Sequence, residues 1–314
     1  MDKVSLSTQI KIEAEKLGFS ACGIAQANAL TTDAAYLKSW LESGKHGSMQ
    51  YMERHIEKRT DPRLLVENTK SLVVVLLNYY PEKKQEEKFP QLAKFAYGDD
   101  YHDIIKVKLY ALLEKINSLC YPEKVCGRAF TDSAPILERQ WARQAGLGWI
   151  GKNGNLIHPT FGSFCFIGEL LIDISLSYDI PMENHCGKCN KCLSACPTNA
   201  INENQSIDAT KCISYLTIEH KQPIPKQFHA KLTNQLFGCD CCQDVCPWNK
   251  KAVATTVQEF FPSKGLLTLT SNDWIALSEE QFAQLLPFSP IKRSGYKKIT
   301  DTAVLLHRYS SNRS

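Results

Sequence analysis

The spacing of apolar residues predicts a helix at the start of the chain, followed by a strand and a second helix. Residues 6–17 carry apolar side chains at helical spacing, and Gly18 is placed to end that helix. Residues 19–25 form a short, mostly apolar segment typical of a buried strand, and residues 34–42 repeat the helical pattern. Helices and strands therefore alternate from the beginning of the chain.

The strongest strand signal is the run SLVVVLLNY at residues 71–79. It is continuously apolar and rich in β-branched side chains, which predicts a central strand that is buried on both faces. Further predicted elements are helices at 101–120 and 135–145 and strands at 125–130 and 164–174. Pro135 suits the first position of its helix. Together these elements predict a mixed helix-and-strand domain over residues 1–175.

The C-terminal part of the chain, residues 251–314, has a helical pattern. Its apolar stripe consists of Trp274, Leu277, Phe282, Leu285 and Leu286, and basic residues follow at Lys292, Arg293, Lys297 and Lys298. A basic segment of this kind is commonly a solvated face, but it also suits contact with a phosphate backbone. The sequence leaves both interpretations open.

Composition narrows the class of protein. The chain has 314 residues, a net charge of +4 and 13 cysteines. Residues 1–16 are charged and amphipathic, unlike a secretory signal, and no apolar run of about 18 residues predicts a membrane span. Cysteines in this context indicate metal-binding thiolates in a reducing cytoplasm rather than disulfides. The weak net charge decides nothing about a nucleic-acid partner.

Most of the cysteines lie in two closely spaced runs. These are Cys186-x-x-Cys189-x-x-Cys192-x-x-x-Cys196-Pro197 and Cys239-x-x-Cys242-x-x-x-Cys246-Pro247, with Cys212 between them. In bacterial ferredoxins three close cysteines bind one [4Fe–4S] cluster, and the fourth binds the other cluster. The spacing predicts one cluster on Cys186, Cys189, Cys192 and Cys246, and a second on Cys196, Cys212, Cys239 and Cys242.

Structural zinc is the alternative, because paired C-x-x-C motifs also build tetrahedral sulfur sites. The third evenly spaced cysteine and the Cys-Pro pairs that close both runs favour the clusters. Cys241 lies next to Cys242, but the C-x-x-C spacing from Cys239 predicts that Cys241 is not a ligand.

Three features outside the cysteine runs give weaker signals. Residues 146–151 match G-x-G-x-x-G, but a helix precedes them, so we reject a dinucleotide site and predict a tight turn or a ligand-facing loop. Asp132 ends a predicted strand and is either a cap of the next helix or a catalytic carboxylate. His102, at the start of a helix, is predicted to be a packing residue.

Two adjacent clusters transfer single electrons, so the mixed domain is predicted to hold the electron acceptor. A flavin and a corrinoid are the candidates for that acceptor. An electron-transfer protein with a purely structural helix-and-strand domain is the alternative. Spacing alone therefore predicts an iron–sulfur reductase with a second cofactor.

Several short stretches between residues 5 and 250 carry a family resemblance. They are Glu57-Lys58-Arg59, Gly98-Asp99-Asp100-Tyr101-His102, Thr131-Asp132-Ser133-Ala134-Pro135, Ala145-Gly146-Leu147-Gly148-Trp149-Ile150-Gly151-Lys152-Asn153, Cys212-Ile213-Ser214-Tyr215-Leu216-Thr217, Gly238-Cys239-Asp240 and Cys246-Pro247-Trp248-Asn249. In this combination they resemble the epoxyqueuosine reductases, which catalyse the last step of queuosine synthesis in tRNA.

The resemblance implies an α+β protein of three parts. These are a nitroreductase-like cobalamin-binding domain at 1–175, a ferredoxin-like domain with two [4Fe–4S] clusters at 176–250, and a short helical region at 251–314 that is similar to truncated HEAT-like repeats. It also implies base-off cobalamin without a protein ligand to cobalt. The residues implied around this cofactor are Arg59, Asp132, Leu156, Ile167, Ser214, Cys239 and Asp240. For Leu156 and Ile167, plain core positions are the competing interpretation.

The same resemblance implies the chemistry. The clusters reduce cobalt one electron at a time, and the epoxide-bearing ring of the modified base is reduced in turn. The epoxide oxygen leaves as water, so an acid has to protonate it, and the family's proton donor corresponds to Asp132. Such an acid needs a raised pKa near neutral pH, which burial beside an apolar corrin would provide.

The implied substrate is tRNA that carries epoxyqueuosine at the wobble position. Its predicted contacts are Lys221, Lys292, Arg293, Lys297 and Lys298. We further expect a low-potential electron donor of unidentified nature, no membrane partner, and a monomer in the cytoplasm. A corrinoid reductive dehalogenase is the alternative function, because it combines the same cofactors, but the twin-arginine signal typical of that class is not found in this sequence.

Overall fold

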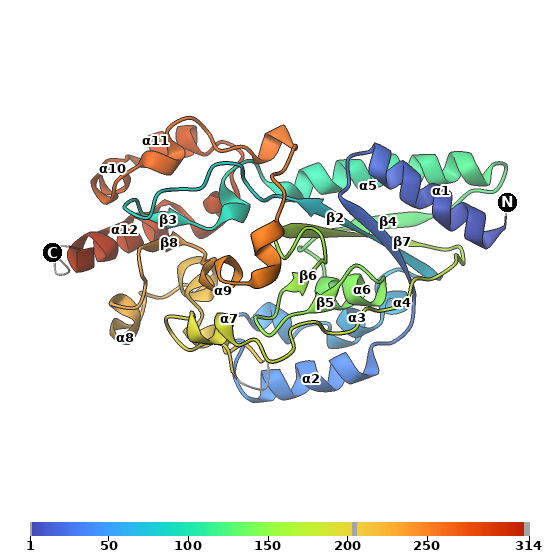
Figure 1. Cartoon of the computed structure of the whole chain (residues 1–314), viewed down its shortest axis with the longest axis horizontal. Coiled ribbons are helices and arrows are strands. Elements are labelled where there is room, and N and C mark those ends of the chain that lie inside the picture. Colours follow the sequence, from blue (N-terminus) through green and yellow to red (C-terminus); the bar gives the residue numbers. More distant parts are fainter. Residues whose placement is uncertain (1, 203–205, 311–314) are drawn as a thin grey trace. The chain divides into compact units, whose positions relative to one another are not determined.

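The computed structural model describes residues 2–202 and 206–310, which divide into two compact units (Figure 1). The first unit comprises Met1–Ser43, Tyr51–Asn78 and Tyr101–Cys189, and the second comprises Gly44–Gln50, Tyr79–Asp100 and Asn190–Ser314. Two stretches of the N-terminal half, Gly44–Gln50 and Tyr79–Asp100, thus fold with the C-terminal half. The three consecutive domains predicted from the sequence did not include this arrangement.

The first unit is built on a four-stranded antiparallel sheet in the order β1-β2-β7-β4. Its strands are β1 (Ala21–Gln26), β2 (Ser71–Asn78), β7 (Cys165–Ile172) and β4 (Gly127–Phe130). β2 lies between two neighbours and all of its residues are buried, so the central strand predicted at 71–79 is confirmed.

Side chains of β7 alternate between the two faces of the sheet, and different helices cover each face. On one face α5 approaches so closely that a Cβ on Gly168 would lie 2.5 Å from Ile105. On the other face Ile167 and Leu171 pack against Trp141 of α6. α1 packs beside α5, so the sheet lies between two helical layers (Figure 1). The helices of this unit are α1 (Lys3–Lys16), α2 (Thr31–Glu42), α3 (Ile56–Thr60), α4 (Pro62–Leu65), α5 (Tyr101–Cys120) and α6 (Glu138–Gln144).

The helices predicted at 34–42 and 101–120 are confirmed as α2 and α5, but the helix predicted at 135–145 begins later. α6 starts at Glu138, after Leu137 as the N-cap. The residues before it form an irregular turn in which Asp132 has a left-handed backbone conformation, with φ 52°. The chain has to leave β4 through this turn before a helix can start, so Pro135 does not occupy the first helical position.

The glycine motif at 146–151 connects α6 to the hairpin of β5 (Trp149–Ile150) and β6 (Leu156–Ile157). Gly148 has φ 144°, and a Cβ at this position would lie only 2.2 Å from the carbonyl oxygen of Ile157. A side chain cannot be accommodated there. Close backbone packing therefore accounts for the motif without a dinucleotide.

The second unit contains short strands and mostly short helices. β3 (Gln91–Leu92) and β8 (Gln235–Phe237) form a two-stranded parallel pair. The cysteine-rich segment lies around α7 (Lys191–Ser194) and α9 (Cys241–Asp244), which pack together. α8 (Lys226–His229) lies between the cysteine runs in the sequence and packs against the C-terminal helix.

The C-terminal segment of this unit is helical, as predicted. Its helices are α10 (Ser271–Ala276), α11 (Glu279–Leu285) and α12 (Tyr296–Ser310), and α12 packs against α10 and β8 (Figure 1). Trp274, Phe282 and Leu286 of the predicted apolar stripe are buried. None of the helices in the described parts of the chain is long and apolar enough to span a bilayer.

Candidate active site and cluster-binding cysteines

The candidate active site of the first unit is the turn that follows β4. Asp132 adopts its left-handed conformation at a cost of ~1–2 kcal/mol for a residue with a side chain. The turn is held by Thr131, whose Oγ1 donates to the carbonyl oxygen of Ile167 over 2.8 Å. The N–H of Ser133 donates to the carbonyl oxygen of Thr131 over 2.6 Å. Backbone strain held in this way is concentrated at functional sites.

Two side chains at the start of α5 contact the Asp132 carboxylate. Tyr101 donates its hydroxyl to Oδ2 over 3.1 Å, and Nε2 of His102 lies 3.2 Å from the same oxygen. Tyr101 also stacks on the rings of His102 and Phe166, with centroids 4.2 Å and 4.0 Å away. The prediction that His102 serves in packing is therefore incomplete, and sequence analysis missed Tyr101 and His102 as site residues. The signal for them was the Gly98-Asp99-Asp100-Tyr101-His102 motif, which the resemblance had already singled out.

Asp132 does not cap the following helix. The N-cap of α6 is Leu137, which makes no side-chain cap bond. The Asp132 side chain is 42% exposed, and its contacts go to Tyr101 and His102 of α5. The capping interpretation is therefore wrong, and the carboxylate is placed where it can reach a ligand.

Two carboxyl groups lie behind the Asp132 turn. The backbone N–H of Asp132 donates to Oε1 of Glu138, and Glu138 interacts with the fully buried Glu169 of β7. Burial, together with the charge of Asp132, raises the pKa of Glu138 to about 8. Burial also raises the pKa of Glu169 well above its usual range, with Glu138 adding to the effect. Both groups are therefore mainly neutral acids at pH 7.

Arg59, a predicted cobalamin contact, is a buried cation. The residue is 8% exposed, and its guanidinium donates to the carbonyl oxygens of Tyr51 over 2.6 Å and Arg54 over 3.2 Å. Burial lowers the pKa of Arg59, and no carboxylate partner offsets this effect within the described residues. A buried guanidinium without an acid suits the polar groups of a cofactor, since its planar fork of donors matches oxygen acceptors.

Leu156 and Ile167 belong to the apolar core of the first unit, together with Leu76 and Trp141. They are only 6% and 9% exposed. The core interpretation of these two residues is therefore confirmed, while their contact with a corrin stays a prediction.

Cysteines of both runs converge in the second unit. Burial raises the pKa of the Cys242 thiol, and the neighbouring Cys212, Cys196 and Cys192 raise it further. Cys239 precedes α9 and shares a side-chain hydrogen bond with Cys241. Thiols gathered in this way repel one another as thiolates, and a cationic iron centre removes that repulsion. This donor set fits the cluster predicted on Cys196, Cys212, Cys239 and Cys242.

The first predicted cluster uses cysteines from both units. Cys186 and Cys189 end the first unit, whereas Cys192 and Cys246 belong to the second. The N–H of Cys189 donates to the carbonyl oxygen of Cys186 over 3.1 Å, which gives the motif a compact turn. Within the described ranges, no set of three His, Cys, Asp or Glu side chains is arranged to hold a single metal ion.

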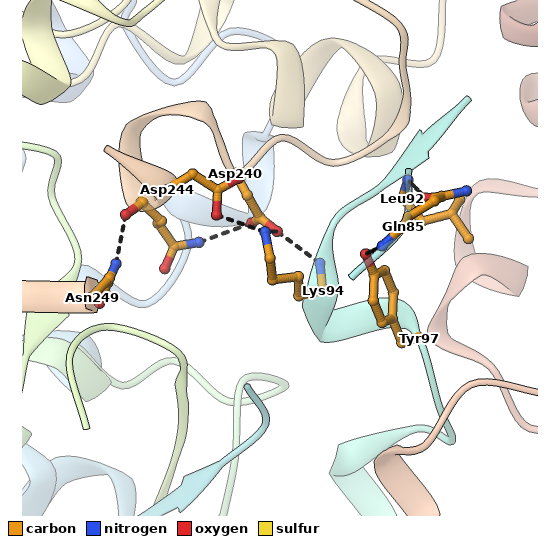
Figure 2. A network of polar contacts seen from close by, with 8 residues as sticks. Gln85, Leu92, Lys94, Tyr97, Asp240, Asp244 and Asn249 are labelled. Atoms are coloured by element: carbon orange, nitrogen blue, oxygen red, sulfur yellow. Dashed lines mark hydrogen bonds and ion pairs between the residues drawn. The ribbon is translucent and has the colours of Figure 1, made fainter. Parts of the chain in front are cut away.

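A buried ion pair anchors the loop that carries Cys239 and Cys242 (Figure 2). Nζ of Lys94 lies 3.2 Å from Oδ2 of Asp240 and 2.7 Å from Oδ1 of Asp244. The backbone N–H of Lys94 also donates to Oδ2 of Asp240 over 2.8 Å, and Gln243 donates to Oδ1 over 3.0 Å. Burial lowers the pKa of Lys94, but the two aspartates outweigh it and hold the pKa above its usual range. Lys94 was not found from the sequence, because nothing in its neighbourhood marks its distant acidic partners.

The other predicted cofactor and tRNA residues of the second unit have local contacts. Ser214 is half-buried and precedes the π-helix Tyr215–Glu219, a type of helix that is frequent at functional sites. The basic residues bind acceptors within their own unit: Lys292 to the Pro287 carbonyl, Arg293 to Glu219, Lys297 to Asp301 and Lys298 to the Gln222 carbonyl.

Among the predicted tRNA contacts, Lys298 has a strongly perturbed pKa. It is half-buried, and its pKa is lowered to about 8 by burial and by the charge of Lys221, with Asp301 opposing the change. Two lysines that repel each other form a site at which an anion is favoured. The two predicted tRNA residues Lys221 and Lys298 are therefore brought together by the fold.

Comparisons with known proteins identify the family of this chain. The family described as "Epoxyqueuosine reductase QueG, DUF1730" matches residues 59–133, and the family described as "4Fe-4S double cluster binding domain" matches residues 185–249. An epoxyqueuosine reductase of Cellulophaga algicola is 48% identical over 290 residues, which cover 92% of this chain and 94% of that protein.

Solved structures give the same result. An epoxyqueuosine reductase in complex with an epoxyqueuosine-modified tRNA-Tyr stem loop aligns with a TM-score of 0.88 at 29% identity, over 97% of this chain and 81% of that one. A Bacillus subtilis epoxyqueuosine reductase, whose catalytic aspartate loop is swung out of the active site, aligns with a TM-score of 0.89 at 28% identity, over 97% and 82% of the two chains. The dehalogenase and the plain electron-transfer protein are therefore not retained as alternatives. The chain belongs to the epoxyqueuosine reductases, enzymes that act on tRNA, and it carries their double [4Fe–4S] cluster domain.

Proposed function

We propose that the chain reduces epoxyqueuosine to queuosine at the wobble position of tRNA, with electrons passing from two [4Fe–4S] clusters to a bound cobalamin. Family membership supports the reaction, and the match at 185–249 supports two electron-transfer centres. The observation that carries the proposal is the strained turn at Asp132, whose carboxylate is held by Tyr101 and His102.

The proposed cobalamin site combines a cation with an apolar wall. Arg59 would donate to the polar side groups of the corrin, and Leu156 and Ile167 would pack on the ring. The remaining proposed contacts are Asp132, Ser214, Cys239 and Asp240. When bound in its base-off form, cobalamin supplies strongly reduced cobalt as the electron donor to the epoxide-bearing ring. Both carboxylate oxygens of Asp240 already accept hydrogen bonds, so we assign its contact to the backbone.

Asp132 is the proposed general acid. The epoxide oxygen leaves as water, and a positioned acid has to protonate it as the carbon–oxygen bonds break. Tyr101 and His102 both contact Oδ2, and these contacts hold the carboxyl group in position. The Bacillus subtilis relative, with its catalytic aspartate loop swung out, indicates that such a loop can move, and this supports the same role for the Asp132 turn.

The iron sites and the tRNA site are proposed on the same basis. Cluster one is assigned to Cys186, Cys189, Cys192 and Cys246, and cluster two to Cys196, Cys212, Cys239 and Cys242. The relative bound to a modified stem loop supports recognition of an anticodon loop, whose single-stranded bases can enter a pocket. Lys221, Lys292, Arg293, Lys297 and Lys298 are assigned to its phosphates. We further propose a monomer that acts in the cytoplasm, where tRNA is found, with an unidentified low-potential electron donor.

The test is the Asp132→Asn variant, assayed anaerobically on tRNA that carries epoxyqueuosine. The carboxamide is nearly isosteric but cannot donate the proton, so turnover should fall about 10²–10⁴-fold. Cobalamin and iron content should match wild type. Asp103→Asn is the matched control, because this exposed residue lies on the same helix as Tyr101 and His102. Wild-type turnover in Asp132→Asn would remove Asp132 from the mechanism.

A further inference from the structure

The stoichiometry of the reaction demands more than one proton. Conversion of an epoxide to an alkene breaks two carbon–oxygen bonds and consumes two electrons and two protons, and the oxygen leaves as water. The electrons come from the reductant of the established activity. A single carboxylic acid delivers a single proton, so Asp132 has to be reprotonated within each turnover or assisted by a second acid.

We propose that Glu138 and Glu169 form a buried acid pair that resupplies Asp132 with the second proton of each turnover. This inference rests on the proposed role of Asp132 as the general acid. Glu138 is the link to Asp132, because its Oε1 accepts a hydrogen bond from the Asp132 backbone N–H. Glu169 stands behind Glu138 on β7, inside the sheet.

The distance between the groups suits proton transfer. A hydrogen bond joins Oε1 of Glu138 to the backbone nitrogen of Asp132, and an aspartate's carboxyl carbon lies ~3–4 Å from its own nitrogen. The two carboxyl groups are therefore at most ~7 Å apart, a gap that one water molecule or one side-chain rotation closes. Glu138 is half-buried whereas Glu169 is fully buried, so a proton from solvent reaches the pair through Glu138.

The surroundings of Glu138 and Glu169 favour the protonated form of both carboxyl groups. Glu169 is fully buried, and neither of its carboxyl oxygens has a well-formed hydrogen-bond partner among the described residues. The charge of Asp132 raises the pKa of both carboxyl groups, whereas Arg139 from α6 and His102 from α5 lower the pKa of Glu138 but do not outweigh its burial. Arg139 directs its guanidinium to the carbonyl oxygen of Gly154 over 3.0 Å. A buried carboxyl without a cation is stable only in its neutral form.

The proposed sequence balances protons and charge. Asp132 protonates the epoxide oxygen as the first carbon–oxygen bond breaks, and it becomes a carboxylate. The acid pair then transfers one proton to Asp132 and keeps the other. Asp132 donates the second proton as the second bond breaks, which releases water and leaves the alkene. Solvent recharges the pair through Glu138.

Glu138→Gln and Glu169→Gln test this proposal. Glutamine keeps the size and, at residue 138, the oxygen that accepts the Asp132 N–H, but it cannot supply a proton. We expect kcat to fall about 10-fold or more in Glu138→Gln, with KM for tRNA unchanged. The solvent deuterium isotope effect on kcat should rise, because proton resupply becomes rate-limiting. Added imidazolium buffer should restore the rate in proportion to its concentration.

Control variants distinguish proton resupply by Glu138 from a merely structural role of this residue. Glu138→Asp, which keeps a titratable carboxyl, should regain part of the rate without buffer. Glu114→Gln, an exposed acid of α5, should behave as wild type. Should Glu138→Gln fail to retain its cofactors, Glu169→Gln, which leaves the Glu138 hydrogen bond to the Asp132 N–H in place, gives the same readouts.

The outcomes distinguish this proposal from the function on which it rests. If Asp132→Asn is inactive while both glutamine variants show wild-type kcat, isotope effect and buffer independence, the acid pair is overturned and Asp132 keeps its role. If Asp132→Asn is fully active, both proposals fall. Lowered kcat without any buffer rescue or change in isotope effect would also overturn proton resupply and leave the pair as a structural feature.

Discussion

Replacement of Lys94 by Met should destabilise the second unit and preferentially affect cluster two. Lys94 and Asp240 are only 7% and 8% exposed at their side chains, whereas Asp244 is 47% exposed. Loss of one partner of a buried ion pair typically costs 3–5 kcal/mol, and an exposed pair contributes about 0–1 kcal/mol. The hydrogen bonds that Asp240 accepts from Gln243 and from the backbone of residue 94 survive. We therefore expect a loss of about 3 kcal/mol in the free energy of unfolding.

Anaerobic urea unfolding, followed by the visible absorbance of the clusters, measures this effect. Since the slope against urea is about 1–3 kcal/mol/M, the midpoint should fall by about 1–3 M. Cys239 and Cys242 flank Asp240, so cluster two should be lost first, and the isolated variant should contain about half of the wild-type iron. Lys88→Met removes a surface pair with Glu86, in which both side chains are 66% exposed, and should change the midpoint little.

A double variant separates electrostatics from packing. Asp240→Asn in the Lys94→Met background removes the uncompensated charge, so it should recover part of the lost stability. Equal midpoints for Lys94→Met and wild type, together with full iron content, would refute the reasoning. The Lys94 ion pair would then contribute little to stability despite its burial.

Three further predictions concern the iron ligands and the tRNA site. Cys241→Ser should keep the full iron content, whereas Cys242→Ser should lose about half of it, and iron loss in Cys241→Ser would overturn the ligand assignment. Replacement of both Lys297 and Lys298 by Glu should weaken tRNA binding and flatten its salt dependence, while the cluster spectra stay unchanged. If the binding curves superimpose on those of wild type across a salt series, these lysines belong to a solvated face and do not contact tRNA. The lowered pKa of Lys298, about 8, means that its charge is present below pH 8 and lost above it. tRNA affinity should therefore fall as pH rises through 8 in wild type but stay constant in Lys298→Arg, and parallel pH curves for the two proteins would contradict a phosphate contact there.

Local sequence determined the elements whose patterns are strong. The run at 71–79 became the central strand β2, since continuous β-branched residues cannot be accommodated at a solvated edge. The amphipathic pattern at 101–120 became α5. The cysteine spacing alone indicated a double [4Fe–4S] cluster domain, and the family match at 185–249 supports it. Three thiolates at fixed short intervals are the ligand pattern of such clusters.

Other features depended on contacts that no local pattern encodes. The helix predicted from Pro135 begins at Glu138, because the left-handed Asp132 and its hydrogen bonds delay it. Tyr101 and His102 reach Asp132 across the fold, from a helix about thirty residues earlier in the chain. A helix start predicts neither contact, since both depend on how α5 packs on the sheet.

The sequence by itself determined the family and the double [4Fe–4S] cluster domain, because both rest on residue types at fixed spacing, and the family resemblance then pointed to Asp132 as the catalytic candidate. Only the tertiary structure decided which groups act on that carboxyl and which charges are buried. Glu138 and Glu169 lie 31 residues apart in the chain, and Lys94 lies 146 residues from Asp240. A pKa or a buried ion pair depends on dielectric surroundings and on partners brought together by folding, and neither is a property of a local stretch of sequence.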